Sequence, residues 1–269
     1  MEGYNSYRIP VPAAYEALFS HFYFAENKSG ETVVKTLMPS YQTMMVFCFG
    51  NPASFLAKDK DEITIDKCMV LGPVRHAFNY SLPPNGEILV CNFKDDAFFR
   101  FFGDINLAQD IALHPDELLN ENCFTALWSQ LNKTTNNEHR LRIILDFCHP
   151  YLRDRHPIAA QLADFDRETF SPIKGVSKEN KLSERAIQIN HKKYFGYTAK
   201  ELYRYHRFLK AIKIIQTLLS EKAQVDWFEI IDQCGYYDQS QLIRDFNHYL
   251  HLSPAKYLKF QEAICNPRD

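Results

Sequence analysis

An internal repeat with an offset of 55 residues constrains the fold of this 269-residue chain more than any other feature. LSERAIQINHKKYFGYTAKEL at residues 182–202 matches YDQSQLIRDFNHYLHLSPAKY at residues 237–257. Each copy predicts a helix that begins at a capping side chain, followed by a short turn and a second capped helix. The aligned pairs are Ser183 and Asp238, Ile187 and Leu242, His191 and Phe246, Thr198 and Ser253, and Leu202 and Tyr257.

The second copy, with the residues just before it, carries the signals of a helix-turn-helix. Asp226 followed by Glu229 is a capping-box pattern that opens a helix. Gly235 accepts the left-handed conformation and predicts the end of that helix. Asp238 then caps the next helix, and Gln241 completes a second box. In the helix-turn-helix plan this second helix enters the major groove of DNA. Its buried stripe is predicted at Leu242, Phe246 and Leu250.

The opposite face of this recognition helix is polar. Arg244 can reach the edge of guanine and Gln239 that of adenine when they point into the groove. Ser240 can contact a base or a phosphate, whereas Asn247 and His248 lie further along and are expected on the DNA backbone. A solvated face on an ordinary three-helix bundle would carry the same residues. The repeat, together with the charge pattern, favours DNA over that alternative.

Charge is divided between the two ends of the chain. The net charge is −2, but residues 1–170 carry −7 and residues 171–269 carry +5. Between Lys174 and Lys213 there are 11 basic residues and 3 acidic ones. A basic lobe neutralises phosphates and releases counterions, although a solvated basic helix face has the same composition. The two halves are therefore expected to have different partners.

Cysteine usage and hydropathy indicate the compartment. The seven cysteines are far apart and none forms a C-x-x-C pair, which argues against a disulfide framework or a zinc ribbon. No apolar run approaches the about 20 residues of a membrane span, and the N-terminal segment lacks the pattern of a secretory signal. We therefore expect a cytoplasmic protein with no membrane segment.

The first 115 or so residues predict mostly β-structure. Short runs rich in Val, Ile, Phe and Tyr are broken by Pro, Gly and Asn, as in TMMVFCFGNP, ITIDKCMVLGP and EILVCNF. Such a series indicates a barrel or sandwich, with a short helix after it at residues 96–102. Apolar residues recur at helical spacing from near Pro115, stop at the polar stretch 132–138 and then resume, which predicts two helices. These two helices suit a connector, a dimer interface or packing against the barrel. Another apolar stripe predicts a long helix over residues 199–220.

Roughly residues 170–260 resemble the AraC/XylS family of bacterial transcription regulators. The segment GYYDQSQLIRDFNHYLHLSPAKYL carries the match: a glycine, an aromatic residue, a polar cap, an Arg and a Phe two positions apart, then Ser-Pro and Tyr. The resemblance implies sequence-specific binding of double-stranded DNA, and it makes RNA polymerase a candidate partner. The matching residues are Gly235, Tyr236, Asp238, Arg244, Phe246, Ser253, Pro254 and Tyr257, and upstream Ser183, Arg185, Gly196 and Arg207.

The first unit departs from the family pattern. The family usually has Arg where this chain has Ile189, and an aromatic core residue where it has His191. Ile189 removes an expected DNA contact, whereas His191 can stay neutral and hydrogen-bonded in the core. In the second unit His251 replaces a usual glycine. The first recognition helix is therefore expected to add more affinity than specificity. Its candidate DNA contacts are Ser183, Arg185, Gln188, Lys192 and Lys193, with the lysines on phosphates.

The front half resembles, more distantly, the β-rich sensor domains attached to one branch of the family. The similarity lies in LMPSYQTMMVFCFG, LGPVRHAF and NFKDDAFFRFFGD. It implies a cupin-like barrel that binds a small-molecule effector or mediates homodimerisation. By strand alternation, Phe47, Phe49, Tyr80 and Phe93 are candidates to line an apolar pocket, although a plain core role also fits each of them.

A cupin-type metal-dependent enzyme fused to a DNA-binding domain is the main alternative. A metal would need two or three His and a carboxylate in strand geometry, and the front half offers His21 and His76, far apart. G-x-S-x-G, H-E-x-x-H and glycine-rich phosphate loops do not occur. We therefore expect a regulator without catalytic residues, metal or cofactor. Its β-rich sensing or dimerising domain, with a helical connector, is predicted at residues 1–155 and its double helix-turn-helix domain at 165–265.

Overall fold

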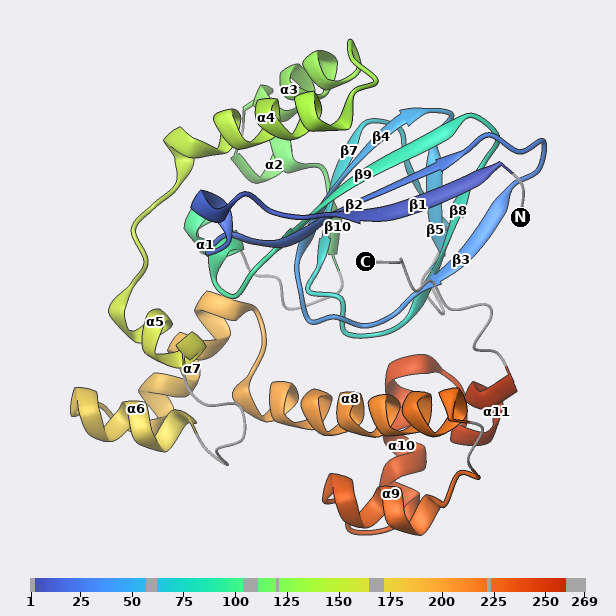
Figure 1. The fold of residues 1–269 in the computed structure, drawn as a ribbon. Helices are drawn as coiled ribbons and strands as arrows, with labels where there is room; N and C mark the ends of the chain where they lie inside the picture. The colour runs from blue at the N-terminus through green and yellow to red at the C-terminus, as the bar shows by residue number, and fades with distance from the viewer. Residues whose placement is uncertain are drawn as a thin grey trace.

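The computed structural model describes residues 3–56, 62–103, 111–119, 121–164, 172–221 and 224–259. Strands fill the first part of the chain and helices the second, as the sequence predicts (Figure 1). Within the described ranges, no helix combines the length and the apolar character that a membrane crossing needs. The strands are β1 (Tyr4–Ile9), β2 (Phe19–Asn27), β3 (Val33–Leu37), β4 (Met44–Gly50), β5 (Ala53–Leu56), β6 (Ile63–Ile65), β7 (Cys68–Gly72), β8 (Phe78–Leu82), β9 (Gly86–Phe93) and β10 (Ile111–Leu113).

Two antiparallel sheets face each other and form a sandwich. One has the strand order β1-β2-β9-β4-β7-β10 and the other β3-β8-β5-β6. Side chains from both sheets meet in one apolar core between them, for example Met44 and Val46 from β4 with Phe55 and Tyr80 from the smaller sheet. The predicted barrel or sandwich is therefore present as a two-sheet structure.

The outer face of the larger sheet is covered by helices. Met45 and Phe47 alternate with the inward residues of β4 and pack against α1 (Ala97–Phe102), α3 (Cys123–Leu131) and α4 (Asn137–Cys148). A short helix, α2 (Pro115–Leu119), precedes α3. Because β4 is covered on both faces, its sequence is apolar almost without a break. The helix break predicted at residues 132–138 lies between α3 and α4.

The helical part is built around α8 (Ala199–Ser220), which has the bounds predicted for the long helix. The side chain of Thr198 caps it, and Glu201 returns a hydrogen bond to the Thr198 N–H at 2.7 Å, which completes a capping box. Figure 1 shows α6 and α7 at one end of α8 and α9 to α11 at the other. The other helices are α5 (Pro157–Asp164), α6 (Pro172–Asn180), α7 (Glu184–Phe195), α9 (Trp227–Cys234), α10 (Gln239–Leu250) and α11 (Pro254–Lys259).

Candidate nucleic-acid interface and ligand cavities

The α9–turn–α10 unit forms through the caps that its sequence predicts. The carboxylate of Asp226 accepts a hydrogen bond from the backbone of Phe228 at 2.9 Å, and Gly235 ends α9 with a φ of 72°. Asp238 caps α10 by accepting from the Gln241 N–H at 2.7 Å. The Gln241 side chain accepts from the Tyr237 N–H, one residue before the position of a standard capping box. The turn is thus fixed by side chains on both sides of it.

One face of α10 is buried and the opposite face is exposed. Leu242 and Phe246 lie in the core with at most 1% of their surface exposed. The exposed positions follow a helical stripe, because residues three and four apart share one face. Four candidate DNA-binding residues lie there: Gln239, Ser240, Arg244 and Asn247.

The first unit repeats this arrangement on α7. The hydroxyl of Ser183 caps the helix by accepting from the Ala186 N–H at 3.2 Å. His191 occupies the core with 2% exposure, and its Nδ1 donates to the carbonyl oxygen of Tyr197 at 2.8 Å. Burial lowers the pKa of His191, so the neutral form fits the site. The candidate residues Ser183, Arg185, Gln188, Lys192 and Lys193 are exposed.

Two candidate DNA-binding residues face the sandwich domain. Lys193 Nζ lies 5.7 Å from the ring centroid of Phe99 on α1. The ring of His248 packs edge-on against His76, which follows β7, at 4.6 Å between centroids. His76 Nδ1 also donates to the His248 carbonyl oxygen at 2.7 Å. These positions were assigned by helix periodicity, and they lie where the two halves of the protein meet.

The loop between β7 and β8 binds the ends of both recognition helices. Arg75 Nη2 donates to the carbonyl oxygen of Gly196, which ends α7, at 2.6 Å. The Ala77 N–H donates to the carbonyl oxygen of Tyr249, near the end of α10, at 2.7 Å. Tyr41, before β4, stacks on Tyr205 of α8 at 4.6 Å between centroids. The sandwich domain therefore holds both helix-turn-helix units through backbone acceptors and ring contacts.

A buried carboxylate joins α10 to α8. Asp245 is 1% exposed, and its two oxygens accept from Arg204 Nε at 2.6 Å and Arg207 Nη2 at 2.9 Å. The Arg207 guanidinium also lies 4.3 Å from the ring centroid of Tyr236. Burial opposes the charge of Arg207, but Asp245 raises its pKa above the ordinary value. The sequence marked Arg207 but not Asp245, which is an acidic residue beside the core residue Phe246.

A cavity of about 300 Å³ lies inside the sandwich. Its walls are mostly apolar, and Arg8, His21 and Asn92 are among the few polar residues along them. Tyr80 also lines it, and its hydroxyl lies 3.0 Å from that of Tyr23 on the opposite sheet. Of the four predicted pocket residues, Tyr80 therefore borders the sandwich cavity.

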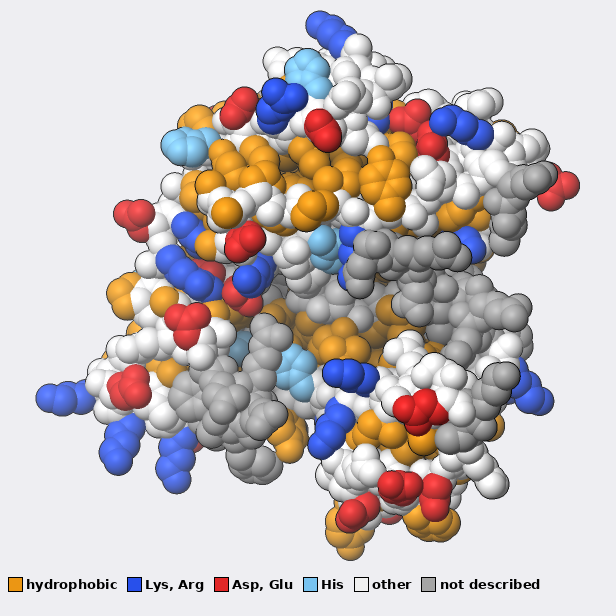
Figure 2. Space-filling view, viewed as in Figure 1, with side chains coloured by type: hydrophobic (Ala, Val, Ile, Leu, Met, Phe, Trp, Pro, Cys, Tyr) orange, Lys and Arg blue, Asp and Glu red, His pale blue; other side chains and the backbone are white. Residues whose placement is uncertain are grey.

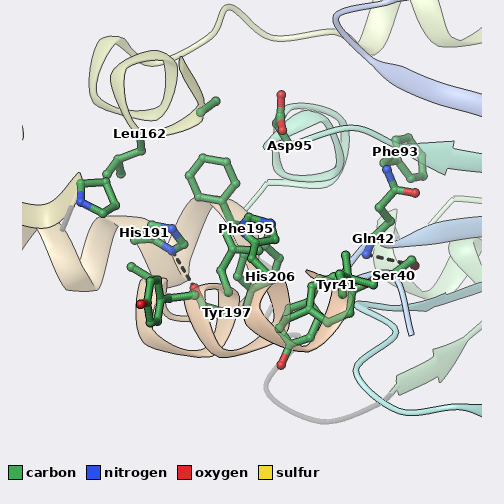
Figure 3. A pocket seen from close by; sticks show the side chains of 17 residues that line it. Ser40, Tyr41, Gln42, Phe93, Asp95, Leu162, His191, Phe195, Tyr197 and His206 are labelled. Atoms are coloured by element: carbon green, nitrogen blue, oxygen red, sulfur yellow. Dashed lines mark hydrogen bonds between the residues drawn. The ribbon is translucent and has the colours of Figure 1, made fainter. Parts of the chain in front are cut away.

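A second cavity, of about 330 Å³, lies between the sandwich and the helical domain. Figure 3 shows Ser40, Gln42 and Phe93 on one side of it, and Phe195 and His206 of the helical domain among the residues around it. It shares residues Ser40, Gln42 and Tyr205 with the sandwich cavity, so the two cavities meet there.

Of the other predicted pocket residues, Phe93 lines this second cavity, whereas Phe47 and Phe49 lie on the outer face of β4. Phe47 is fully buried among the residues that pack against α3 and α4. The ring centroid of Phe49 lies 3.8 Å from the guanidinium carbon of Arg140 on α4. Strand alternation groups these residues together but does not say which face of the sheet borders a cavity. Both side chains stand in the core under the helices.

Histidine, cysteine and carboxylate side chains do not gather into a metal site in the described part of the chain, where no group of three or more lies close enough to hold an ion. His21 borders the sandwich cavity and His76 contacts α10, so the two histidines considered from the sequence are in different places. A cupin-type metal site would need further ligands that this arrangement does not bring together.

The fold is a two-sheet sandwich followed by an all-helical domain with two helix-turn-helix units. It is similar to ToxT from Vibrio cholerae, at 14% identity and a TM-score of 0.43, over 96% of this chain and 98% of that one. A fatty-acid-bound ToxT from strain SCE256 gives 12% identity and a TM-score of 0.41, over 100% and 99% of the two chains. A cupin protein from Desulfovibrio desulfuricans covers 34% of this chain and 83% of its own, at 10% identity and a TM-score of 0.28.

No family model matches the sequence, and no curated protein matches it. At these low identities and TM-scores, the roles of individual residues in this chain rest on its own geometry.

Proposed function

We propose that this protein is a cytoplasmic, sequence-specific DNA-binding transcription regulator. The observation that carries the proposal is the pair of matched helices α7 and α10. Each begins at a side-chain cap, buries one stripe and exposes a polar face, and they belong to units at opposite ends of α8. Helices of this kind enter successive major grooves of one duplex. The resemblance of the repeat to AraC/XylS regulators supports the same function.

Charge around the two units favours DNA on the side of α6, α7 and α8. Figure 2 shows Lys and Arg side chains gathered at the end of the molecule where α6 lies, and acidic and hydrophobic side chains around α9. Lys174, Lys178 and Lys181 are exposed on or beside α6, whereas Glu229 and Asp232 are exposed on α9. Basic side chains pair with phosphates, so α6 and α7 are suited to backbone contacts and α10 to base contacts.

The test is equilibrium binding of the full-length protein to duplex DNA at several salt concentrations. If basic residues neutralise phosphates, the logarithm of the binding constant falls linearly with the logarithm of the salt concentration. Replacing Lys192, exposed on α7, with Ala should make that slope shallower by about one, the value expected for one lost phosphate contact. Lys133 after α3, also exposed but outside both units, is the matched control. Binding that is absent or insensitive to salt would overturn the proposal.

We further propose that the sandwich cavity binds a small effector with an apolar body and one acidic group. The apolar walls suit the body, and Arg8 and His21 are the cationic or protonatable groups along them. The cavity reaches Tyr205 of α8, whose hydroxyl donates to the Pro39 carbonyl oxygen at 2.5 Å. A ligand that reaches Tyr205 touches both halves of the protein, and this supports regulation through an effector.

The effector proposal is tested with dodecanoic acid and dodecanol as probes of the purified protein. The acid should raise the unfolding temperature more than the alcohol does, because only the acid has a carboxylate that can pair with Arg8. An Ile88→Trp variant, which fills the cavity from β9, should lose this difference, whereas an exposed Val34→Trp variant should keep it. Equal effects of acid and alcohol on the wild type would contradict the assignment of an acidic ligand.

A further inference from the structure

Ile189 is an apolar residue in the middle of the exposed polar stripe of α7. Its side chain is 60% exposed, in a helix whose other large apolar residues are buried. Arg185 and Lys192 lie four and three residues away from it, and Gln188 lies three and four residues from those two, so all four share one helical face. An exposed isoleucine among charged and polar neighbours gains nothing from this position in the free protein.

The repeat relates Ile189 to the main predicted base-reading residue of the second unit. Ile189 is six residues after the cap of α7 at Ser183, and Arg244 is six residues after the cap of α10 at Asp238. Both side chains are exposed, and both helices have 12 residues. Two residues after Ile189 comes His191, and two residues after Arg244 comes Phe246, and both are buried in the core. The two helices thus present Ile189 and Arg244 from equivalent positions.

The surroundings of Ile189 indicate what covers it. Arg185 and Lys192, on either side, are cationic and would meet phosphates or base edges rather than an apolar protein surface. The major groove offers one apolar group, the 5-methyl of thymine, while the remaining base edges are hydrogen-bond donors and acceptors. Isoleucine is branched at Cβ and keeps one preferred rotamer in a helix, so little side-chain entropy is lost on contact.

We propose that Ile189 reads a thymine methyl group in the half-site bound by α7, at the position where α10 reads a base with Arg244. This inference rests on the proposed DNA-binding function and makes it more specific. It also reverses the expectation from the sequence, which took Ile189 as the loss of a contact. The first unit then contributes sequence preference through an apolar contact, not only affinity through phosphates.

The experiment uses the full-length protein and a duplex that it selects from a random pool. Each thymine of the duplex is replaced in turn by deoxyuridine, which lacks only the 5-methyl group. At one thymine in the half-site of α7, the replacement should weaken wild-type binding about fourfold, the factor expected for one buried methyl group. Ile189→Ala should bind the thymine duplex more weakly and lose the difference between the two duplexes. Ile189→Val, which keeps a branched Cβ, should retain part of it.

Arg244→Ala is the matched control from the equivalent position of α10. It should lose affinity for the selected duplex but keep the fourfold effect of deoxyuridine at the α7 thymine. If the wild type tolerates deoxyuridine at every position, or if Ile189→Ala keeps the wild-type difference, the proposal for Ile189 is overturned while DNA binding stands. If the protein selects no sequence, both the proposal and the function on which it rests are overturned.

Discussion

Arg204 Nε lies 2.6 Å from Asp245 Oδ1, and this contact ties the second recognition helix to the helix that joins the two units. The other oxygen of Asp245 accepts a hydrogen bond from Arg207, so one buried carboxylate has two cationic partners. It lies next to Arg244 in the sequence, but on the opposite side of α10 from the exposed stripe. The orientation of the exposed polar face of α10 therefore depends on a buried charge.

Asp245→Ala should strongly destabilise the helical domain. The change leaves Arg207, whose side chain is 13% exposed, without its partner, and breaking a buried pair from one side costs about 3–5 kcal/mol. Urea denaturation followed by circular dichroism measures the loss. Asp232→Ala, at an exposed position on α9, is the control and should change stability by less than about 0.5 kcal/mol. Similar small effects from both variants would show that the ion pairs do not fix α10.

Arg244→Ala tests direct reading of a base. If the guanidinium contacts a base edge, the variant should lose about 1–3 kcal/mol of binding free energy on the selected duplex and much less on random DNA. Fluorescence anisotropy with both duplexes gives the two values under one salt condition. An equal loss on both would assign Arg244 to a phosphate instead.

His191 gives the helical domain a dependence on pH. Its folded-state pKa lies below the ordinary 6.5 because burial disfavours the charged ring, so the unfolded chain binds more protons as the pH falls. The contribution of His191 to stability is therefore full above pH 6.5 and declines below it. His191→Phe, which copies Phe246 from the second unit, should make the fall of total stability shallower in urea denaturation between pH 7.5 and 5.5. Parallel profiles for wild type and variant would exclude His191 as a source.

Arg75→Ala should loosen the first unit from the sandwich domain. The change removes the guanidinium that donates a hydrogen bond to the carbonyl oxygen of Gly196, the residue at which α7 ends. Amide hydrogen exchange should become faster at the end of α7, while exchange in β9 and β4 at the centre of the larger sheet stays the same. Arg142→Ala, exposed on α4, is the control. Unchanged exchange at α7 would show that Arg75 does not hold this helix.

The helices of the C-terminal half could be predicted because their boundaries are local. Thr198, Asp226 and Asp238 are capping residues that act within three residues of themselves, and the bounds of α8, α9 and α10 follow from them. The sequence also predicts His191 in the core with a hydrogen bond, and the side chain is buried there and bonded to the Tyr197 carbonyl oxygen. These features depend on neighbours in sequence, so periodicity and caps are enough.

The contacts between the two domains could not be predicted in the same way. Lys193, although exposed, and the half-buried His248 also contact the sandwich domain, and the residues that they contact, Phe99 and His76, are more than 90 residues away in the sequence. Phe47 has the right alternation, but only the position of α3 and α4 decides that its face of β4 is covered. Long-range packing of this kind has no signature within a single segment.

Selection of duplexes from a random pool by the full-length protein tests the central claim most directly. Two recognition helices at the ends of α8 should enrich one bipartite sequence, with the centres of its halves about 10 base pairs apart, one turn of the double helix. Guanine is predicted within reach of Arg244 in one half, and thymine opposite Ile189 in the other. A pool that stays random after repeated rounds, with binding equal to that of unselected DNA, would contradict the account.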